Sequence, residues 1–421
     1  MTTGYRTISH PNWIYLRVSN KYLEKKSPLE KRLKRHIAGR VHSFFVATTP
    51  GFEELCLEEM KSLPLSMAEF SMVRGGIEFN GRLNDCYIAN LHLRIANRVL
   101  MRIAGFKASN FSRLEKNLSL LPWELYLPHG MIPEISTSTK HSRLYHKEAI
   151  DERIKAAIVN RQGLVDFYQR PESIAPLSQE LFVRVVDDHF TVSIDSSGEL
   201  LYKRGLKEHN ARAPIRETIA AAALRMAGYS GDEPLLDPMS GSGTFSLEAA
   251  MIATGRPSGL YREFAFMGWP SFVPEQWRYI RKESEKKIID LKSPLIIASE
   301  KDPRLHEALK ERIDRHNLSK AIIVINRDFF DLKRKDLPVI FNTPRPGLVI
   351  INPPYGVRLG TKKKSRELFL QIIKKLGNDF KGWRYALFIH DYTLIREVPF
   401  KKNSIALDHG GLKLTLLTGT V

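Results

Sequence analysis

The segment at residues 235–244 reads Leu235-Leu236-Asp237-Pro238-Met239-Ser240-Gly241-Ser242-Gly243-Thr244. An apolar run, an acid, a turn with two glycines and the start of another apolar segment predict a strand, a tight turn and a helix. Glycine lets the backbone come close to a ligand, and the N–H groups of the helix start face that ligand. The segment therefore indicates a nucleoside site, although a plain strand-to-helix turn can use the same residues.

The same turn limits which nucleotide can bind. It lacks the third glycine of the dinucleotide fingerprint and the Gly-Lys-Ser/Thr of a P-loop, so a pyrophosphate ligand is disfavoured. S-adenosylmethionine, a nucleoside without phosphate, fits better. The contacts expected from this segment come from Asp237, Pro238, Ser240, Gly241, Gly243 and Thr244.

Acids follow the next two apolar runs. Glu300 comes after residues 295–298, and Asp328 follows residues 321–325. A nucleoside-binding sheet offers a carboxylate to the ribose at a strand end, so we expect Glu300 at the ribose and Asp328 at the adenine amino group. Taken singly, a solvated acid or a turn residue would also explain each of them.

The most specific motif follows a fourth apolar run and reads Ile350-Ile351-Asn352-Pro353-Pro354-Tyr355-Gly356. An exocyclic base nitrogen is a poor nucleophile because its lone pair is delocalised, so acceptors aimed at its hydrogens assist attack on a methyl group. The Asn352 side chain and the Pro353 carbonyl can accept, and Tyr355 can stack on a flipped-out base. We expect Asn352 to touch the cofactor as well. Positioning and polarisation carry such a reaction, so the predicted catalytic set is Asn352, Pro353, Pro354 and Tyr355, with no metal.

The pattern around these motifs places them in one domain. After residue 205, strands expected at 234–236, 295–298, 321–325, 347–351, 385–389 and 412–417 alternate with helices expected at 214–227, at 244–253 and after Asp302. This alternation is typical of an α/β, Rossmann-like, mostly parallel doubly wound sheet. The region before it is mixed α and β, with helices expected at 87–100 and 147–160 and a hairpin at 181–194. In this region, residues of the types used in catalysis do not occur at a spacing typical of an active site.

Composition restricts the partners. The 421 residues carry a formal charge of +19, from 65 Lys and Arg against 46 Asp and Glu, which favours a polyanion such as nucleic acid. Ten cations lie in the first 40 residues, either as a nucleic-acid-binding arm or as a solvated extension. Two cysteines exclude a disulfide scaffold, and no apolar run is long enough for a membrane span. We therefore expect a cytoplasmic protein without membrane contact.

Residues 206–421 resemble a class I S-adenosylmethionine-dependent methyltransferase. The chain as a whole resembles the bacterial 23S ribosomal RNA guanine-N2 methyltransferases that carry a THUMP domain, through segments 44–55, 89–100, 213–218, 235–244, 264–270 and 352–360. The resemblance implies a ferredoxin-like segment at 42–80, a THUMP domain at 81–195 and a methyltransferase domain at 206–421, after a basic extension at 1–41. It also implies S-adenosylmethionine as cofactor and large-subunit ribosomal RNA as partner, and no obligate protein partner is evident.

Three departures from the family pattern stand out. The family often has cysteine where Ser240 stands and aspartate where Glu300 stands, and both replacements keep a small residue or a carboxylate. The segment after the Asn-Pro-Pro-Tyr motif is usually acidic, but here it contains Lys362, Lys363, Lys364 and Arg366. We expect these cations in a loop on the rim of the active site, where they can hold RNA phosphates or simply face solvent.

The main hypothesis is methylation of guanine N2 in large-subunit ribosomal RNA. Methylation of adenine N6 in RNA or DNA is the alternative, because the motif serves any planar exocyclic nitrogen, although the THUMP-like half argues against DNA. A non-catalytic RNA-binding assembly factor is the third possibility. The intact Asp237, Gly241, Gly243 and Asn352 argue against it.

Overall fold

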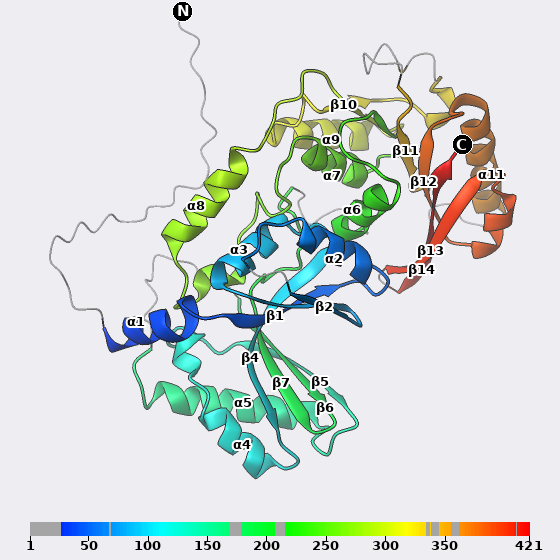
Figure 1. Cartoon of the computed structure of the whole chain (residues 1–421). Coiled ribbons are helices and arrows are strands. Elements are labelled where there is room, and N and C mark those ends of the chain that lie inside the picture. Colours follow the sequence, from blue (N-terminus) through cyan, green and yellow to red (C-terminus); the bar gives the residue numbers. More distant parts are fainter. Residues whose placement is uncertain are drawn as a thin grey trace, which may run out of the picture.

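The computed structural model describes residues 27–66, 69–167, 178–206, 215–333, 337, 345–354, 362–409 and 411–421. The chain forms two seven-stranded sheets with helices packed on them (Figure 1). The first sheet belongs to the N-terminal half, and the second belongs to the C-terminal half. The expected α/β class with a preceding α+β region is confirmed.

The C-terminal sheet is mostly parallel. Its strands are β8 (Leu235–Asp237), β9 (Ile296–Ser299), β10 (Ile322–Ile325), β11 (Leu348–Ile351), β12 (Arg384–Ile389), β13 (Lys401–His409) and β14 (Leu412–Thr420). They lie in the order β10-β9-β8-β11-β12-β14-β13; β14 pairs antiparallel with both β12 and β13, and the other neighbouring strands pair parallel. The direction of strand succession therefore reverses between the neighbours β8 and β11.

Helices cover both faces of this sheet. They include α6 (Glu217–Met226), α7 (Thr244–Ala253), α9 (Pro303–Arg315) and α11 (Lys362–Asp379), with 3₁₀ turns η3 (Ala265–Gly268), η4 (Phe329–Asp331) and η7 (Tyr392–Glu397), whereas α8 (Pro274–Glu285) packs on α3 (Leu83–His92) of the N-terminal half. Alternate residues of β11 face opposite sides, so Leu348 and Ile350 join one core and Val349 and Ile351 join the other. The second core includes the apolar side of α11.

The N-terminal sheet is a single sheet built from two parts. Its strands are β1 (His42–Thr48), β2 (Phe70–Val73), β3 (Gly76–Gly81), β4 (Ala96–Lys107), β5 (Glu134–Lys140), β6 (Glu180–Val186) and β7 (His189–Asp195), in the order β2-β3-β1-β4-β7-β6-β5. The long strand β4 pairs with β1 on one side and with β7 on the other, and so joins the two parts. Helices α2 (Glu53–Lys61), α3 (Leu83–His92), α4 (Phe111–Ser119) and α5 (Lys147–Gln162) and the 3₁₀ turn η2 (Trp123–Leu125) complete this half.

Two expectations about local structure are wrong. The helix expected at 87–100 ends at His92, and residues 96–100 begin strand β4, because pairing with β1 and β7 overrides their helical pattern. The basic segment expected as a loop is instead the start of helix α11. The hairpin β6–β7 and helices α5 and α7 are confirmed.

Part of the basic N-terminal extension is packed against the rest. Residues 1–26 lie outside the described structure, but α1 (Pro28–Leu33) and the π-helical turn η1 (Lys34–Ala38) are described. Leu33 and Ile37 are buried, and Arg32 pairs with Glu124 at 2.5 Å. For residues 28–38, the interpretation as a purely solvated extension is therefore wrong.

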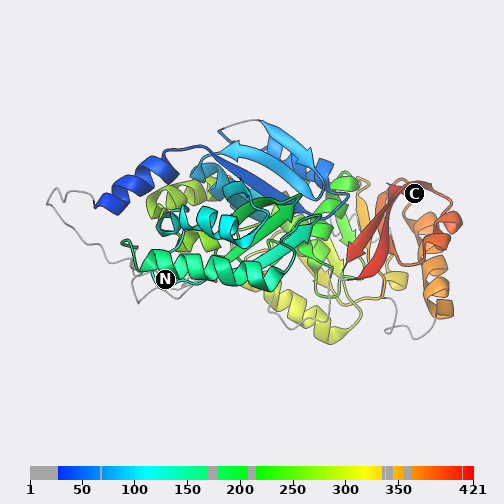
Figure 2. The same cartoon turned by 90° about the horizontal axis from the view of Figure 1, so that it is seen from below.

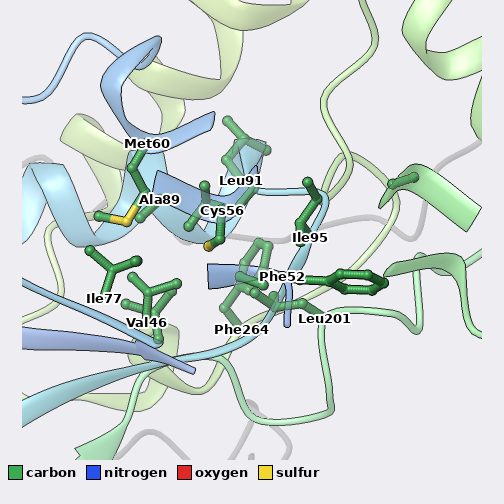
Figure 3. Close-up of a cluster of buried hydrophobic side chains, with 14 of the residues drawn as sticks. Val46, Phe52, Cys56, Met60, Ile77, Ala89, Leu91, Ile95, Leu201 and Phe264 are labelled. Atoms are coloured by element: carbon green, nitrogen blue, oxygen red, sulfur yellow. The ribbon is translucent and has the colours of Figure 1, made fainter. Parts of the chain in front are cut away.

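One hydrophobic core continues from the N-terminal half into the C-terminal half. Figure 3 shows Phe264 of the C-terminal half among Val46, Phe52 and Ile95 of the N-terminal half. The ring of Tyr87 on α3 stacks on Phe266, with centroids 4.5 Å apart. The two halves are therefore packed together as one body. Within the described residues, no helix has the length and apolar character needed to cross a membrane.

A histidine at this junction makes folding sensitive to acid. The His92 ring lies 2.9 Å from the Ser284 hydroxyl of α8, and burial together with the charges of Arg94 and Lys287 lowers the pKa of His92 to about 4. The unfolded chain takes up this proton near pH 6.5 but the folded chain does not, so stability falls as pH drops from about 6.5 towards 4.

We expect His92→Gln to reduce this acid sensitivity. Between pH 7 and 5, urea unfolding should show a loss of free energy that is smaller in the variant by on the order of 1–2 kcal/mol. Equal losses in both proteins would contradict the role of His92.

Candidate cofactor and catalytic site

The two motifs singled out in the sequence end neighbouring strands. Asp237 ends β8, Asn352 follows β11, and the register pairs Leu236 with Val349. Asn352 therefore lies two residues further along the strand direction than Asp237. In open α/β sheets, ligands bind outside the carboxyl ends of the strands where strand succession reverses, and this place is the junction of β8 and β11.

The glycine turn between β8 and α7 has left-handed backbone at both glycines. Gly241 has φ +52° and Gly243 has φ +77°. A Cβ on Gly243 would lie 2.3 Å from a methyl of Leu309, so a side chain there would have to displace Leu309 and would also strain the left-handed backbone. A Cβ on Gly241 would meet nothing within 4 Å, so its backbone borders open space. A ligand can approach the turn at Gly241.

The first acid of the site is fully buried. The Asp237 side chain accepts a hydrogen bond from the Ser246 hydroxyl of α7 at 2.7 Å, which fixes the carboxylate against the helix start. Pro238, Ser240 and Thr244 are buried around it. The Ser240 hydroxyl is shielded from solvent, and among the described residues it has no hydrogen-bond partner. Ser246 was not foreseen because nothing in its spacing marks it.

The acids after β9 and β10 lie at the same edge of the sheet. Glu300 accepts hydrogen bonds from the Gly241 N–H at 2.8 Å and from the Asp302 N–H at 3.0 Å. Asp328 accepts from the Phe330 N–H at 3.0 Å and pairs with Lys301 at 3.2 Å. Glu300 therefore contacts the glycine turn directly. Lys301 is a second residue that sequence reasoning missed.

These groups fit an adenosine that carries a positive charge. Open space at Gly241 admits a ligand beside the turn, and carboxylates line that edge as acceptors for hydroxyl and amino groups. The buried hydroxyl of Ser240 offers a further polar contact. The carboxylates at this edge suit a sulfonium nucleoside better than a pyrophosphate, because they attract positive charge and repel negative charge.

The side-chain oxygen of Asn352 is the most unusual atom of the site. It is shielded from solvent, yet it accepts no hydrogen bond from any described residue. A buried amide oxygen without a donor costs free energy, so such atoms are rare outside functional sites. Pro353 and Pro354 are half-buried beside it, and Tyr355 lies outside the described residues.

The cations after the motif begin an 18-residue helix. Lys363, Lys364 and Arg366 are exposed in the first turns of α11, and Arg366 pairs with Glu397 at 2.8 Å. The side chain of Lys362 lies outside what the structure describes. No acid occupies the first turn, so cations stand where the helix dipole favours an anion.

The chain is similar to known proteins over most of its length. A family described as "RMKL-like, methyltransferase domain" matches residues 204–404, and one described as "RlmL ferredoxin-like domain" matches residues 43–100. The Ribosomal RNA large subunit methyltransferase K/L of Syntrophotalea carbinolica is 30% identical over 89% of this chain and 53% of its own length. The chain thus spans about half the length of this relative.

Two other proteins are matched over most of their own length. The putative RNA methyltransferase YpsC of Bacillus subtilis is 31% identical, with 80% of this chain and 84% of YpsC covered. The crystal structure of SMU.472, a putative methyltransferase complexed with SAH, superimposes with a TM-score of 0.76 at 25% identity. That match covers 90% of this chain and 98% of the other.

Proposed function

Because this chain belongs to the RlmKL-like family of S-adenosylmethionine-dependent RNA methyltransferases, we propose that it methylates the exocyclic N2 of a guanine in 23S ribosomal RNA. The observation that carries this proposal is the buried side-chain oxygen of Asn352, which has no hydrogen-bond partner among the described residues and lies beside the strand that ends in Asp237. An acceptor oxygen in this position can receive a hydrogen bond from the amino group of a base.

Asn352 and Pro353 act on the amino group of the guanine. The Asn352 oxygen accepts one N2 hydrogen and the Pro353 carbonyl accepts the other, which draws the nitrogen towards a pyramidal form with a localised lone pair. S-adenosylmethionine supplies an electrophilic methyl group on a sulfonium. As the N–C bond forms, the C–S bond breaks and the N2 proton is lost to solvent. Pro354 stiffens the turn, and Tyr355 stacks on the flipped-out base.

The residues of the glycine turn and the strand ends hold the cofactor. Asp237 lies along its amino acid part, Glu300 accepts from the ribose hydroxyls and Asp328 accepts from the adenine amino group. The buried position of Asp237 and the contact of Glu300 with Gly241 support this assignment. Pro238, Ser240, Gly243 and Thr244 form the wall of the site.

The rest of the chain binds the RNA in this proposal. We assign a basic extension to residues 1–41, a ferredoxin-like segment to 42–80, a THUMP domain to 81–195 and the methyltransferase domain to 206–421. The formal charge of +19 suits a polyanionic partner, and large-subunit ribosomal RNA in the cytoplasm is the partner that we propose. Lys362, Lys363, Lys364 and Arg366 contact phosphates beside the target base.

Nucleoside analysis tests the reaction itself. Ribosomal RNA from a strain that lacks this protein is incubated with the protein and S-adenosylmethionine, digested and analysed by mass spectrometry. We expect new N2-methylguanosine. New N6-methyladenosine would instead establish the adenine reaction, and cofactor binding without any methylation would contradict catalysis on this RNA.

The basic start of α11 gives a prediction about salt. Replacing Lys362, Lys363, Lys364 and Arg366 together with Gln should weaken RNA binding and lower the slope of log affinity against log salt, because each lost phosphate contact removes roughly 0.7–0.9 of a unit. Cofactor affinity should not change. Loss of the exposed Arg366–Glu397 pair costs little stability.

A matched control uses four cations of α8 and its C-cap: Arg278, Arg281, Lys282 and Lys286. Figures 1 and 2 place α8 and α11 at opposite ends of the molecule. The same change in charge there should alter the salt slope less. Equal slopes in the two quadruple variants would show that the start of α11 is not a phosphate site.

A further inference from the structure

A buried carboxylate joins the two halves of the molecule. Glu248 lies on α7, and its side chain is 1% exposed. One oxygen binds Arg94 Nη1 at 2.8 Å, and the other binds Arg204 Nε at 3.3 Å. Arg94 stands between α3 and β4, and Arg204 belongs to the segment that leads out of the N-terminal half. A helix of the C-terminal half is thus held by two cations from outside it.

Both arginines are themselves fixed by backbone groups. Arg204 donates to the carbonyl of Arg94 at 2.6 Å and to that of Leu201 at 2.7 Å. Arg94 donates to the carbonyl of Arg256 at 2.5 Å, and its own N–H donates to the buried Glu59 of α2 at 2.8 Å. The two cations therefore occupy defined positions, and movement of α7 would break several hydrogen bonds together.

The opposite side of α7 contacts the candidate cofactor site. Ser246 binds Asp237, and Ser246 is only two residues from Glu248. Residues two apart on a helix point about 200° apart around its axis, so one side of α7 holds the cofactor-site acid and the other is held by the N-terminal half. Gly243, at the N-cap of the same helix, ends the glycine turn.

Glu248 is charged in this position. Burial opposes its ionisation, but the charges of Arg204 and Arg94 outweigh burial and hold the pKa of Glu248 below its ordinary value. The contact is therefore an ion pair with both arginines at neutral pH, sheltered from screening by solvent.

We propose that Glu248, Arg94 and Arg204 are positioning residues, which keep α7, the glycine turn and Asp237 in fixed register with the N-terminal half. This inference rests on the proposed function, in which that half holds the RNA. The target nitrogen must meet the methyl group along a line, and a displacement of about 1 Å costs on the order of 10²-fold in rate. A break in this link should therefore lower the rate of methyl transfer while both ligands still bind.

Glu248→Gln tests the link, and Glu124→Gln is its matched control. Glu124 is also buried and also lies between two arginines, Arg161 at 2.8 Å and Arg32 at 2.5 Å, but all three belong to the N-terminal half. Both variants lose one carboxylate from an Arg–Glu–Arg contact, so both should unfold at lower temperature. Assays are run well below both unfolding temperatures.

Single-turnover methyl transfer is measured with saturating RNA and S-adenosylmethionine, and each affinity is measured separately. We expect Glu248→Gln to transfer about 10²-fold more slowly with both affinities kept, and Glu124→Gln to transfer at the wild-type rate. If the two variants lose rate equally, lowered stability explains the effect. If Glu248→Gln loses rate only through weaker cofactor binding, its role is local. Either result overturns the proposal.

A second measurement does not need methylation. S-adenosylhomocysteine is added to the full chain, and hydrogen exchange is followed at the amides of Arg94 and Ile95, which donate to Glu59. We expect slower exchange in the wild type and no response in Glu248→Gln or, if that variant fails to fold, in the milder Arg94→Lys. An equal response in wild type and variant would refute the link. A wild type that binds this probe but methylates no RNA would refute the proposed function alone.

Discussion

Asn352→Ala should lower methyl transfer by a factor of order 10² or more while S-adenosylmethionine still binds. In the proposed mechanism the lost oxygen accepts a hydrogen of the reacting nitrogen, so its contribution grows as that nitrogen pyramidalises and gains positive charge. Single-turnover assays on ribosomal RNA measure the rate, and calorimetry measures the cofactor affinity.

The same change should not destabilise the fold. The Asn352 oxygen is buried, and none of the described residues donates to it, so its removal leaves no donor among them unsatisfied. Thermal unfolding should begin at the wild-type temperature or above it. A stable protein with lost activity identifies a residue kept for function.

Asn352→Asp is the chemical control for this prediction. Aspartate keeps an acceptor oxygen at nearly the same place, so this variant should transfer methyl groups faster than the alanine variant. Wild-type turnover of Asn352→Ala would remove Asn352 from the mechanism, and equal losses in both variants would show that acceptance by the oxygen is not the reason for its role.

Asp237→Ala should remove measurable cofactor binding. A buried carboxylate that meets a charged ligand is worth several kcal/mol, which corresponds to roughly 10²-fold or more in affinity. Titration calorimetry with S-adenosylmethionine measures the loss, and circular dichroism checks that the variant is folded.

Two further variants separate charge from shape at this position. Asp237→Asn keeps an acceptor for the Ser246 hydroxyl but loses the charge, and Ser246→Ala keeps the charge but loses one hydrogen bond. We expect the asparagine variant to bind far more weakly and the Ser246 variant to bind a little more weakly. Full affinity in Asp237→Ala would place the cofactor elsewhere.

Local signals predicted the strand, the glycine turn and the helix start around Asp237 well. The acid of β8, the two glycines and the start of α7 at Thr244 lie within eight residues, and the structure places them as expected. A turn that needs left-handed backbone reveals itself in the sequence because few residues other than glycine adopt it. The strand ends that carry Glu300 and Asn352 were predictable for a similar reason, since short apolar runs precede each of them.

Features that depend on distant partners were not predictable. Residues 96–100 carry a helical pattern, and only pairing with β1 and β7 makes them part of β4. The sequence did contain a signal for helix α11 after the basic run at Lys362. Helical spacing is followed by four buried residues: Phe369, Ile372, Ile373 and Leu376. Glu248 meets Arg94 from 154 positions away, a distance over which no spacing rule operates.

The core that joins the two halves also fixes the distance between them. Because Phe264 and Tyr87 pack into a common interior and Glu248 is bound by Arg94 and Arg204, the described parts of the two halves are held in one relative position. In the proposed function, the distance between the RNA segment bound by the N-terminal half and the methyl group of the cofactor is therefore constant. The guanine that reacts is the one that the folded RNA presents at that distance. If the RNA between the bound segment and the target were lengthened, methylation would move to another nucleotide without any change in the enzyme.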